Sequence, residues 1–194
     1  MSKTDVGAGS SRPLASHRRR RRRIVIAVLA VVLAGVSLLS AHLFVWPDLP
    51  PLPERADAVV QLGGPGNRRS VALELVRQGR APLVAISVSN DEIDRPWCHA
   101  GRLDQVPVIC FHSKPFSTRG EARDVAELAE QHGWRSVILV TSRDQAWRAK
   151  LRVSRCFKGQ ISVAVARLPW YQWPTQIAYQ LGATIKAYTF ETTC

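Results

Sequence analysis

The feature that most restricts the fold is an uncharged stretch of 22 residues, Ile24 to Val45, directly after six consecutive arginines. A helix of this length, rising about 1.5 Å per residue, spans a hydrocarbon core of roughly 30 Å. The stretch exceeds the apolar part of a cleavable signal peptide, which is about 7–15 residues long. We therefore expect one transmembrane helix over 24–45. The alternative is a signal peptide cleaved near Ser40 and Ala41, which are small residues.

Positive charge is concentrated ahead of this stretch. The formal net charge is +12, and residues 1–23, which include the arginines at 18–23, contribute +7 of it. Because positively charged flanks stay on the cytoplasmic side, we expect 1–23 to be a basic cytoplasmic tail. The rest would lie outside the cytoplasm, on a single-pass protein of the plasma membrane. The arginines would also attract anionic lipid, so the bilayer is the expected partner, and no nucleic acid is expected to bind the domain.

Four cysteines, Cys98, Cys110, Cys156 and Cys194, all follow the apolar stretch. An even number of cysteines in an oxidising compartment favours disulfides, although four cysteines allow three pairings. We favour Cys98 with Cys110, which flank a short polar segment, and therefore Cys156 with Cys194. The alternative is that some are buried free thiols. The absence of CxxC and HxxxH spacings argues against a metal site, and no cofactor is expected.

Residues 46–56 form a proline-rich linker, which we expect to be stiff and extended, and 57–194 form one α/β domain. Continuous apolar segments predict buried strands near 57–62, 82–88, 106–111, 136–142 and 161–168. Helical spacing predicts helices over 70–79, 119–133, 143–157 and 175–188, and 89–105 is expected to be irregular. Continuous apolar strands that alternate with helices indicate a parallel sheet covered on both faces. The expected fold is thus a Rossmann-like, three-layer α/β domain with a mainly parallel sheet.

The first candidate site segment is the strand-to-helix turn that contains Gly63, Gly64 and Arg68. Its glycines would let the backbone approach a ligand, and the following helix would direct free N–H groups towards an anion. Arg68 or Arg69 would add a forked donor for phosphate or carboxylate. An ordinary turn between a strand and a helix is the alternative, since neither GxxxxGK[ST] nor GxGxxG is present.

Two further turns carry polar residues. Thr118 and Glu121 have the spacing of a capping box, which would explain both without a function; alternatively they face the same cleft as the glycine turn. Thr141 and Ser142 end a strand, and Ser142 or Asp144 is a candidate cap for the next helix. Gln145 and Arg148, three residues apart, would share a helical face. In a parallel sheet, ligands bind beyond the carboxyl ends of the strands, where these turns would meet.

The order and spacing of these motifs resemble a known family. Four motifs carry the resemblance: DAVVQLGG, R-x3-A-x2-L-x3-G from Arg68 to Gly79, ST-x2-EA from Ser117 to Ala122, and VTS-x2-Q-x2-RA from Val140 to Ala149. With these motifs the chain resembles the SanA/YdcF/ElyC-like family, domain of unknown function 218, in its actinobacterial membrane-anchored branch. The resemblance covers about residues 57–165. It implies a Rossmann-like domain on the periplasmic side of the membrane and a role in envelope integrity, vancomycin tolerance or lipid-carrier-dependent glycan synthesis.

One position departs from the family pattern, because Gln145 stands where the family usually has histidine. Glutamine forms hydrogen bonds but cannot exchange a proton near neutral pH. The resemblance therefore leaves the enzymatic role open, with Glu121, Gln145 and Arg148 as catalytic candidates. One soluble family member is linked to S-adenosylmethionine, but that metabolite is cytoplasmic, which argues against it here.

Two functional hypotheses follow. In the first, the chain is an envelope protein whose cleft binds an anionic, phosphate-bearing ligand, such as a phosphorylated lipid carrier or a cell-wall (peptidoglycan) precursor. Arg68 and Arg148 would hold the anion, Gly63 and Gly64 would donate backbone N–H groups, and Thr118 and Glu121 would orient the ligand. Any reaction would be hydrolysis or transfer at a phosphoryl group. In the second, the chain is a non-enzymatic scaffold or partner-binding module with a vestigial cleft.

Overall fold

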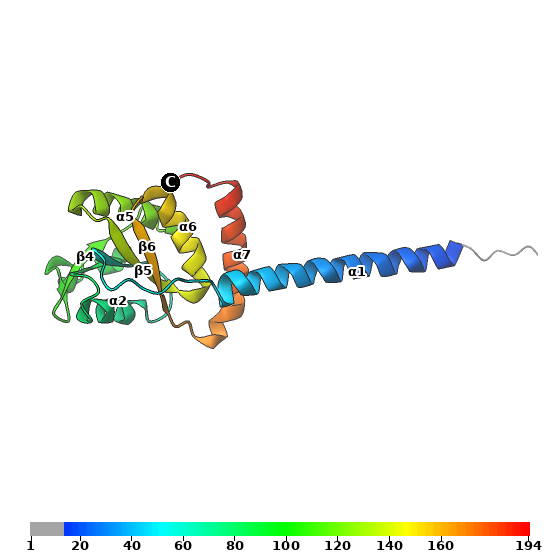
Figure 1. Cartoon of the computed structure of the whole chain (residues 1–194), viewed down its shortest axis with the longest axis horizontal. Coiled ribbons are helices and arrows are strands. Elements are labelled where there is room, and N and C mark those ends of the chain that lie inside the picture. The colour runs from blue at the N-terminus through cyan, green and yellow to red at the C-terminus, as the bar shows by residue number, and fades with distance from the viewer. Residues whose placement is uncertain (1–13) are drawn as a thin grey trace, which may run out of the picture. The chain divides into compact units, whose positions relative to one another are not determined.

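The computed structural model describes residues 14–194, and the first part of the expected basic tail, residues 1–13, lies outside the described residues. The chain divides into two compact units, one ending at Leu39 and the other covering Ser40–Cys194. Helix α1 (Leu14–Ser40) makes up the described part of the first unit (Figure 1). It begins ahead of the arginines, so residues 14–23 are helical. The helical segment Arg18–Val45 is long and apolar enough to cross a membrane, judged by length and composition alone.

The second unit contains a six-stranded sheet in the order β3-β4-β2-β1-β5-β6. The strands are β1 (Ala58–Gln61), β2 (Val84–Ser87), β3 (Arg102–Leu103), β4 (Val106–Phe111), β5 (Ser136–Ser142) and β6 (Gln160–Ala166). All neighbouring strands are parallel except β3, which runs antiparallel to β4. The prediction of a mainly parallel α/β sheet is therefore confirmed. Strands β1, β2 and β5 are buried wholly or largely, which explains their continuous apolar sequences.

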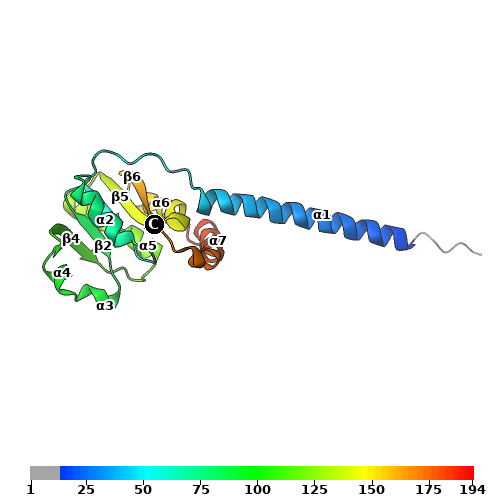
Figure 2. The ribbon, with the colours of Figure 1, turned by 90° about the horizontal axis from the view of Figure 1, so that it is seen from below.

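Helices cover both faces of the sheet (Figures 1 and 2). Helix α2 (Arg68–Arg77) packs on the face that presents Val59, Ile86 and Ile138. Helices α5 (Thr118–His132) and α6 (Ala146–Cys156) pack on the face that presents Val60 and Leu139. Alternate residues of one strand thus enter two cores, as the period of two in a strand requires. The last elements are the short 3₁₀ helix η3 (Trp170–Gln172) and helix α7 (Trp173–Thr189).

Two segments differ from expectation. The stretch 89–105, expected to be irregular, contains the one-turn helices α3 (Asn90–Ile93) and α4 (Pro96–His99) as well as β3. The proline-rich segment 46–56 has no helix or strand, as expected of a linker, but Leu49 and Leu52 pack against the two cores of the domain. It therefore runs along the domain and is not a free spacer.

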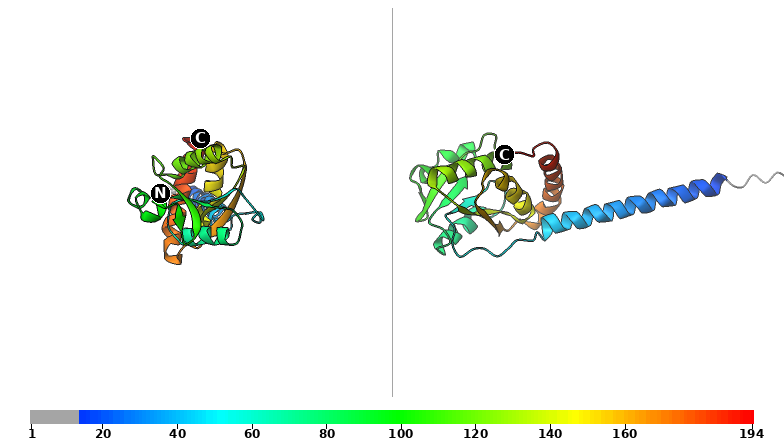
Figure 3. Two further views of the ribbon diagram at one scale, coloured as in Figure 1. Left: turned by 90° about the vertical axis from the view of Figure 1, so that its left-hand side faces the viewer. Right: turned by 45° about the horizontal axis from the view of Figure 1, so that its top comes forward.

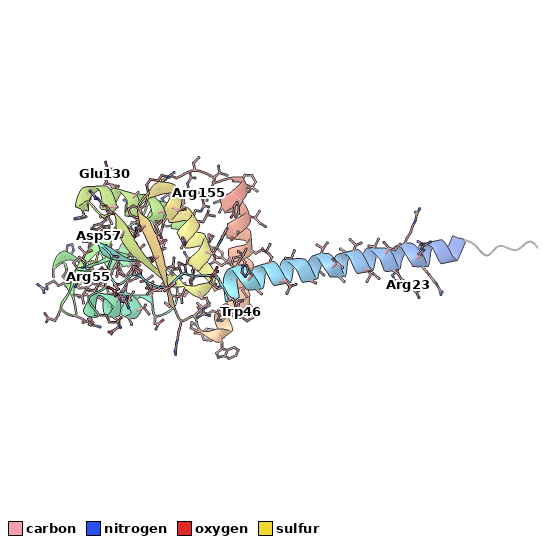
Figure 4. The ribbon with its side chains drawn as sticks, viewed as in Figure 1. Arg23, Trp46, Arg55, Asp57, Glu130 and Arg155 are labelled. Atoms are coloured by element: carbon pink, nitrogen blue, oxygen red, sulfur yellow. A yellow bond between two sulfur atoms is a disulfide. The ribbon has the colours of Figure 1, made fainter. Side chains whose placement is uncertain are left out.

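Both favoured disulfides are present, Cys98–Cys110 beside β4 and Cys156–Cys194 at the end of α6. The second holds the C-terminal segment close to α5 and α6 (Figure 3). Glu191 in this segment accepts a 2.5 Å hydrogen bond from Nη2 of Arg152. Arg155, labelled in Figure 4, donates to the carbonyls of Ala187 and Glu191. The end of α7 is therefore fastened to α6 by a covalent bond and by arginine contacts.

Candidate functional site

The three predicted turns meet at one edge of the sheet and line a pocket of about 320 Å³. Six predicted residues line it, namely Gly63, Gly64, Thr118, Glu121, Gln145 and Arg148. The turns follow β1, β4 and β5. Because β1 and β5 are neighbours whose chains leave towards opposite faces of the sheet, a crevice opens between their carboxyl ends. The topology therefore explains where the pocket lies.

Arg68 does not have the role expected of it. Its side chain is almost fully buried, and all five of its N–H donors have acceptors within the protein. Nε donates to the carbonyl of Pro65 (3.0 Å), Nη1 to those of Leu62 (3.3 Å) and Gly63, and Nη2 to Ser142 Oγ (2.8 Å) and Gln145 Oε1 (3.0 Å). Burial lowers the pKa of Arg68 to about 10, so the guanidinium stays cationic at neutral pH. Arg68 thus braces the glycine turn and has no donor left for a ligand.

Gln145 links two of the turns through both ends of its amide. Oε1 accepts from Arg68, and Nε2 donates to Thr118 Oγ1 over 3.0 Å. Thr118 is therefore not the helix cap that the capping-box interpretation required. The N-cap of α5 is Ser117, whose hydroxyl accepts from the N–H of Gly120. Tertiary contacts compete with local capping here, because the Thr118 hydroxyl accepts from a donor 27 residues away.

Glu121 does not form the expected capping box either. Its Oε1 accepts from the backbone N–H of Gly63 over 2.5 Å, and its side chain is almost completely buried. Burial raises the pKa of Glu121 above its ordinary value of 4.5, while the N–H of Gly63 and the charges of Arg68 and Arg148 oppose that rise. A carboxyl group with a raised pKa in a pocket can donate or accept a proton, so Glu121 is the best-placed group for acid–base chemistry.

Gly63 and Gly64 are required by the closeness of this packing. A Cβ on Gly63 would lie 2.9 Å from the ring of Phe116 and 3.1 Å from Oε1 of Glu121. Gly64 has a φ of +124°, a conformation that residues with a side chain rarely adopt, and a Cβ there would meet the guanidinium of Arg68 at 2.7 Å. The two glycines let the turn lie directly against Glu121 and Arg68.

Arg148 differs from Arg68 because part of its guanidinium is free. Its Nε donates to Gln180 Oε1 over 2.7 Å, and its guanidinium carbon lies 5.9 Å from the centre of the Tyr179 ring. Within the described part of the chain, no protein acceptor bonds to Nη1 or Nη2 of Arg148. Burial lowers the pKa of Arg148, which stays cationic at neutral pH because arginine starts from 12.5. The pocket therefore contains a buried cation with unused donors.

Thr141 and Ser142 lie behind the pocket and do not line it. Ser142 accepts from Arg68, and the Thr141 hydroxyl is buried with no hydrogen-bond partner among the described residues. Ser142 is the N-cap residue of a 3₁₀ turn, but its side chain makes no capping hydrogen bond, and neither Ser142 nor Asp144 is the N-cap of α6. The 3₁₀ turn, η2 (Arg143–Gln145), precedes α6, and the carboxylate of Asp144 accepts from Gln180 Nε2 over 3.0 Å. These residues support the pocket wall.

Helix α7 supplies the residues that sequence reasoning missed. Gln176, Tyr179 and Gln180 line the pocket, and Gln180 joins Arg148 to Asp144. The only sequence signal was the four-residue spacing of Gln176 and Gln180 on a largely apolar helix. Nothing in that spacing identifies Arg148 and Asp144 as their partners, which lie more than 30 residues earlier in the chain.

A second cavity of about 420 Å³ adjoins the pocket and shares Gly63, Gly64 and Phe116 with it. It is lined by polar side chains, including Gln61, Ser87 and Arg69. Three buried polar atoms in this cavity have no hydrogen bond of good geometry, namely Gln61 Oε1, Ser87 Oγ and Arg69 Nε. The hydroxyl of Ser87 nevertheless faces the carboxyl group of Glu121. Elsewhere in the described chain, no three His, Cys, Asp or Glu side chains gather as metal ligands.

Comparison of the chain with models of protein families, with curated proteins and with solved structures found no match in any of the three. The chemistry of the site therefore has to be argued from its own residues.

Proposed function

We propose that this chain is a membrane-anchored protein of the cell envelope whose extracytoplasmic domain binds an anionic, phosphate-bearing ligand in the pocket at the ends of β1, β4 and β5. The observation that carries the proposal is Arg148, a buried guanidinium whose Nη donors have no protein acceptor and which lines a pocket. Glu121 and Asp144 are near enough to act on the charge of Arg148, but among the described residues neither carboxylate forms an ion pair with it. Burying a cation that no carboxylate contacts is costly, and a ligand anion would offset that cost. Two parallel N–H donors also match the geometry of phosphate oxygens.

Other groups in the pocket suit the same ligand. Helix α5 begins at Thr118, beside the pocket, so the positive end of its dipole favours an anion there. Glu121 in its neutral form would donate a hydrogen bond to a phosphate oxygen, and its raised pKa makes that form accessible. The adjoining cavity, with unpaired groups on Gln61 and Ser87, has room for a polar group attached to the phosphate.

Membrane anchorage rests on α1. Its apolar side chains are exposed along the helix, for example Val31 at 72% and Leu38 at 72%, which suits a lipid environment. The arginines at 18–23 favour a cytoplasmic N-terminus, and two disulfides in the domain favour an oxidising compartment outside the cytoplasm.

At a finer level, we propose that the sheet is Rossmann-like and that the chain belongs to the SanA/YdcF-like family. Support comes from the motifs of the resemblance, because their polar residues meet around one pocket. The phosphate would then belong to a phosphorylated lipid carrier or to a cell-wall precursor. Any reaction would be hydrolysis or transfer at the phosphoryl group, with Glu121, neutral when the ligand binds, as the proton donor to the leaving oxygen.

A non-enzymatic binding role is the second candidate. It is favoured by Gln145, which stands where the family usually has histidine and which uses both ends of its amide to join Arg68 and Thr118. A side chain held in this way serves the structure of the pocket and carries no proton. In this case, a ligand would bind at Arg148 without being converted.

The test is a titration of the full chain in lipid nanodiscs with undecaprenyl phosphate and, separately, with uridine diphosphate. We compare the wild type with Arg148→Ala and with Arg95→Ala, which removes an exposed arginine outside the pocket. Arg148→Ala is expected to weaken binding by tenfold or more, and Arg95→Ala to leave it unchanged. Equal affinities for the wild type and Arg148→Ala would overturn the proposal. Turnover of a bound compound would then show that the chain is an enzyme, and binding without turnover would favour the non-enzymatic role.

A further inference from the structure

Helix α7 partly reverses the polar and apolar faces expected of a helix on a soluble domain, although Ala187 is buried and Lys186 and Thr189 are exposed as usual. Its inward face carries Gln180, which is 1% exposed, and Thr184, which is also buried. Its outward face carries Leu181, Ile185 and Tyr188, with Ile185 55% exposed. In water, a surface helix normally turns its apolar side to the core and its polar side outward. The reversed pattern indicates that the outward face of α7 does not meet bulk water.

Large exposed aromatic side chains also lie beyond both ends of the helix. Trp170 in η3 is 83% exposed and Tyr171 is also exposed, while Phe190 just beyond the C-terminal end of α7 is 82% exposed. A contiguous exposed apolar surface on a soluble protein marks an interaction site. Tryptophan and tyrosine are the residues that gather where a lipid bilayer meets water, because their rings are apolar and their N–H or O–H groups are polar.

The charge of the same segment restricts the kind of partner. From Arg167 to Phe190 the sequence contains no aspartate or glutamate, and its only formal charges are Arg167 and Lys186, both positive. Bacterial membranes and other anionic lipid surfaces attract basic residues and repel acidic ones. The next residue after Phe190, Glu191, is paired with Lys186 and with Arg152. An apolar face whose only adjacent carboxylate is paired with cations matches a helix that lies in the plane of a membrane surface.

The position of α7 within the domain agrees with this partner. The segment directly after the apolar helix, η1 (Ala41–Val45), packs against η2 and α6, and its Phe44 is completely buried. Helix α7 packs against the same two elements. If the apolar part of α1 spans the bilayer, as proposed, the chain leaves the membrane at η1, because residues 41–45 pack on the domain. The surface that carries α7 is then the part of the domain nearest to the lipid.

We propose that α7 and η3 form an interfacial helix whose outward face lies among the lipid headgroups. This inference rests on the proposed membrane anchorage and deepens the proposed function. Gln176, Tyr179 and Gln180 of the same helix line the pocket, so a pocket wall would sit at the membrane surface. A ligand whose phosphate is attached to a lipid could then reach Arg148 without leaving the bilayer. The substrate class that this arrangement favours is a lipid-linked phosphate.

The test uses the full chain in nanodiscs made with lipids brominated near the headgroup, which quench nearby tryptophans. The chain has six tryptophans. Trp170→Phe is expected to remove a strongly quenched component, so the quenched fraction of the remaining emission falls. The matched control, Trp97→Phe, removes a half-buried tryptophan of α4 and is expected to raise that fraction. An unchanged or higher quenched fraction in Trp170→Phe would overturn the inference.

A third variant, Trp46→Phe, distinguishes failure of this inference from failure of the proposed anchorage, because Trp46 directly follows η1. If Trp46→Phe lowers the quenched fraction and Trp170→Phe does not, the anchor stands and α7 lies away from lipid. If neither lowers it, the anchorage itself fails. Protection of Trp170 from aqueous acrylamide without quenching by bromine would show that another protein or a second copy covers α7, which also overturns the inference.

A second measurement concerns the ligand. Ile185→Glu places a negative charge on the outward face of α7, away from the pocket. It is expected to weaken the binding of undecaprenyl phosphate in nanodiscs severalfold while leaving the affinity for a water-soluble, short-chain prenyl phosphate unchanged. An equal loss for both ligands, or no loss for either, would contradict delivery from the membrane.

Discussion

The guanidinium of Arg68 and the side-chain amide of Gln145 are joined by a 3.0 Å hydrogen bond from Nη2 to Oε1. The bond connects the turn after β1 with the turn after β5, and Gln145 extends it to Thr118 at the start of α5. A neutral imidazole could make the same pair of contacts, with one ring nitrogen accepting and the other donating. The adjacent cation of Arg68 would disfavour its protonation. Glutamine thus preserves the architecture of the site without a titratable group.

This relationship can be tested by substitution at position 145. Gln145→Ala is expected to lower the free energy of unfolding by about 1–3 kcal/mol, because buried donors and acceptors on Arg68 and Thr118 lose their partner. Gln145→His is expected to recover most of this loss. Thermal unfolding of the purified chain measures both. A histidine variant as unstable as the alanine variant would show that the two contacts do not determine the residue at this position.

The two buried arginines are expected to respond differently to truncation. Arg68→Ala removes the hydrogen bonds to five acceptors, so we expect a loss of stability of about 3–5 kcal/mol. Arg148→Ala removes one internal bond and is expected to cost less stability, but to weaken phosphate binding by about 10–100-fold. Chemical denaturation and ligand titration of both variants measure the difference. The opposite order of stabilities would refute the assigned roles.

The affinity for a phosphodiester is expected to depend on pH through Glu121. Burial raises the pKa of this carboxyl above 4.5, and an anion in the pocket favours its neutral form. Binding should therefore be tightest below that pKa and weaken as the pH rises through it. A phosphodiester keeps its charge over this range, so the slope reports on the protein. Glu121→Gln should bind with little dependence on pH; a slope that persists in this variant would assign the titration to another group.

The two disulfides are expected to differ in their effect on the site. Replacing Cys156 and Cys194 by serine should destabilise the chain by about 3–4 kcal/mol and also weaken ligand binding, because this bridge holds the segment that follows α7. Replacing Cys98 and Cys110 should destabilise it by about 3 kcal/mol and leave binding unchanged. Titration of both variants below their unfolding temperatures measures this. Equal losses of affinity would mean that the bridge does not act through α7.

The orientation of the chain predicts its accessibility to protease. Protease added to intact spheroplasts should digest the domain over 57–194, whereas the same domain should be protected in inside-out membrane vesicles. The intact mass of the membrane-bound chain should include α1, since a cleaved signal peptide would remove it. Digestion in inside-out vesicles would reverse the proposed topology.

Much of the fold could be predicted because its strands are continuous apolar segments between glycine-containing turns. The ends of strands β1, β2, β4, β5 and β6 were predicted to within about two residues. The missed elements, α3, α4 and β3, are too short for periodicity to show. The convergence of three turns followed from the parallel sheet, since the carboxyl ends of its strands share one edge.

The roles of individual side chains were less predictable. Thr118 and Glu121 have the spacing of a capping box, but distant partners on Gln145 and Gly63 engage them instead. The sequence position of Arg68 suggests a residue that binds an anion. In the structure its guanidinium hydrogen-bonds to acceptors of the protein instead, and it stabilises the glycine turn. The contribution of α7 was invisible because it depends on contacts with residues more than 30 positions away.

The burial of Phe44 has a practical consequence for anyone who prepares the domain alone. Its ring is 0% exposed, and the short segment that carries it rests on η2, the turn that holds Gln145. A soluble fragment that starts at Pro47 would discard this ring and leave a void beside the ligand pocket, at a cost on the order of 3–5 kcal/mol. A fragment that starts at Ser40 would keep it, and so preserve the wall of the candidate pocket.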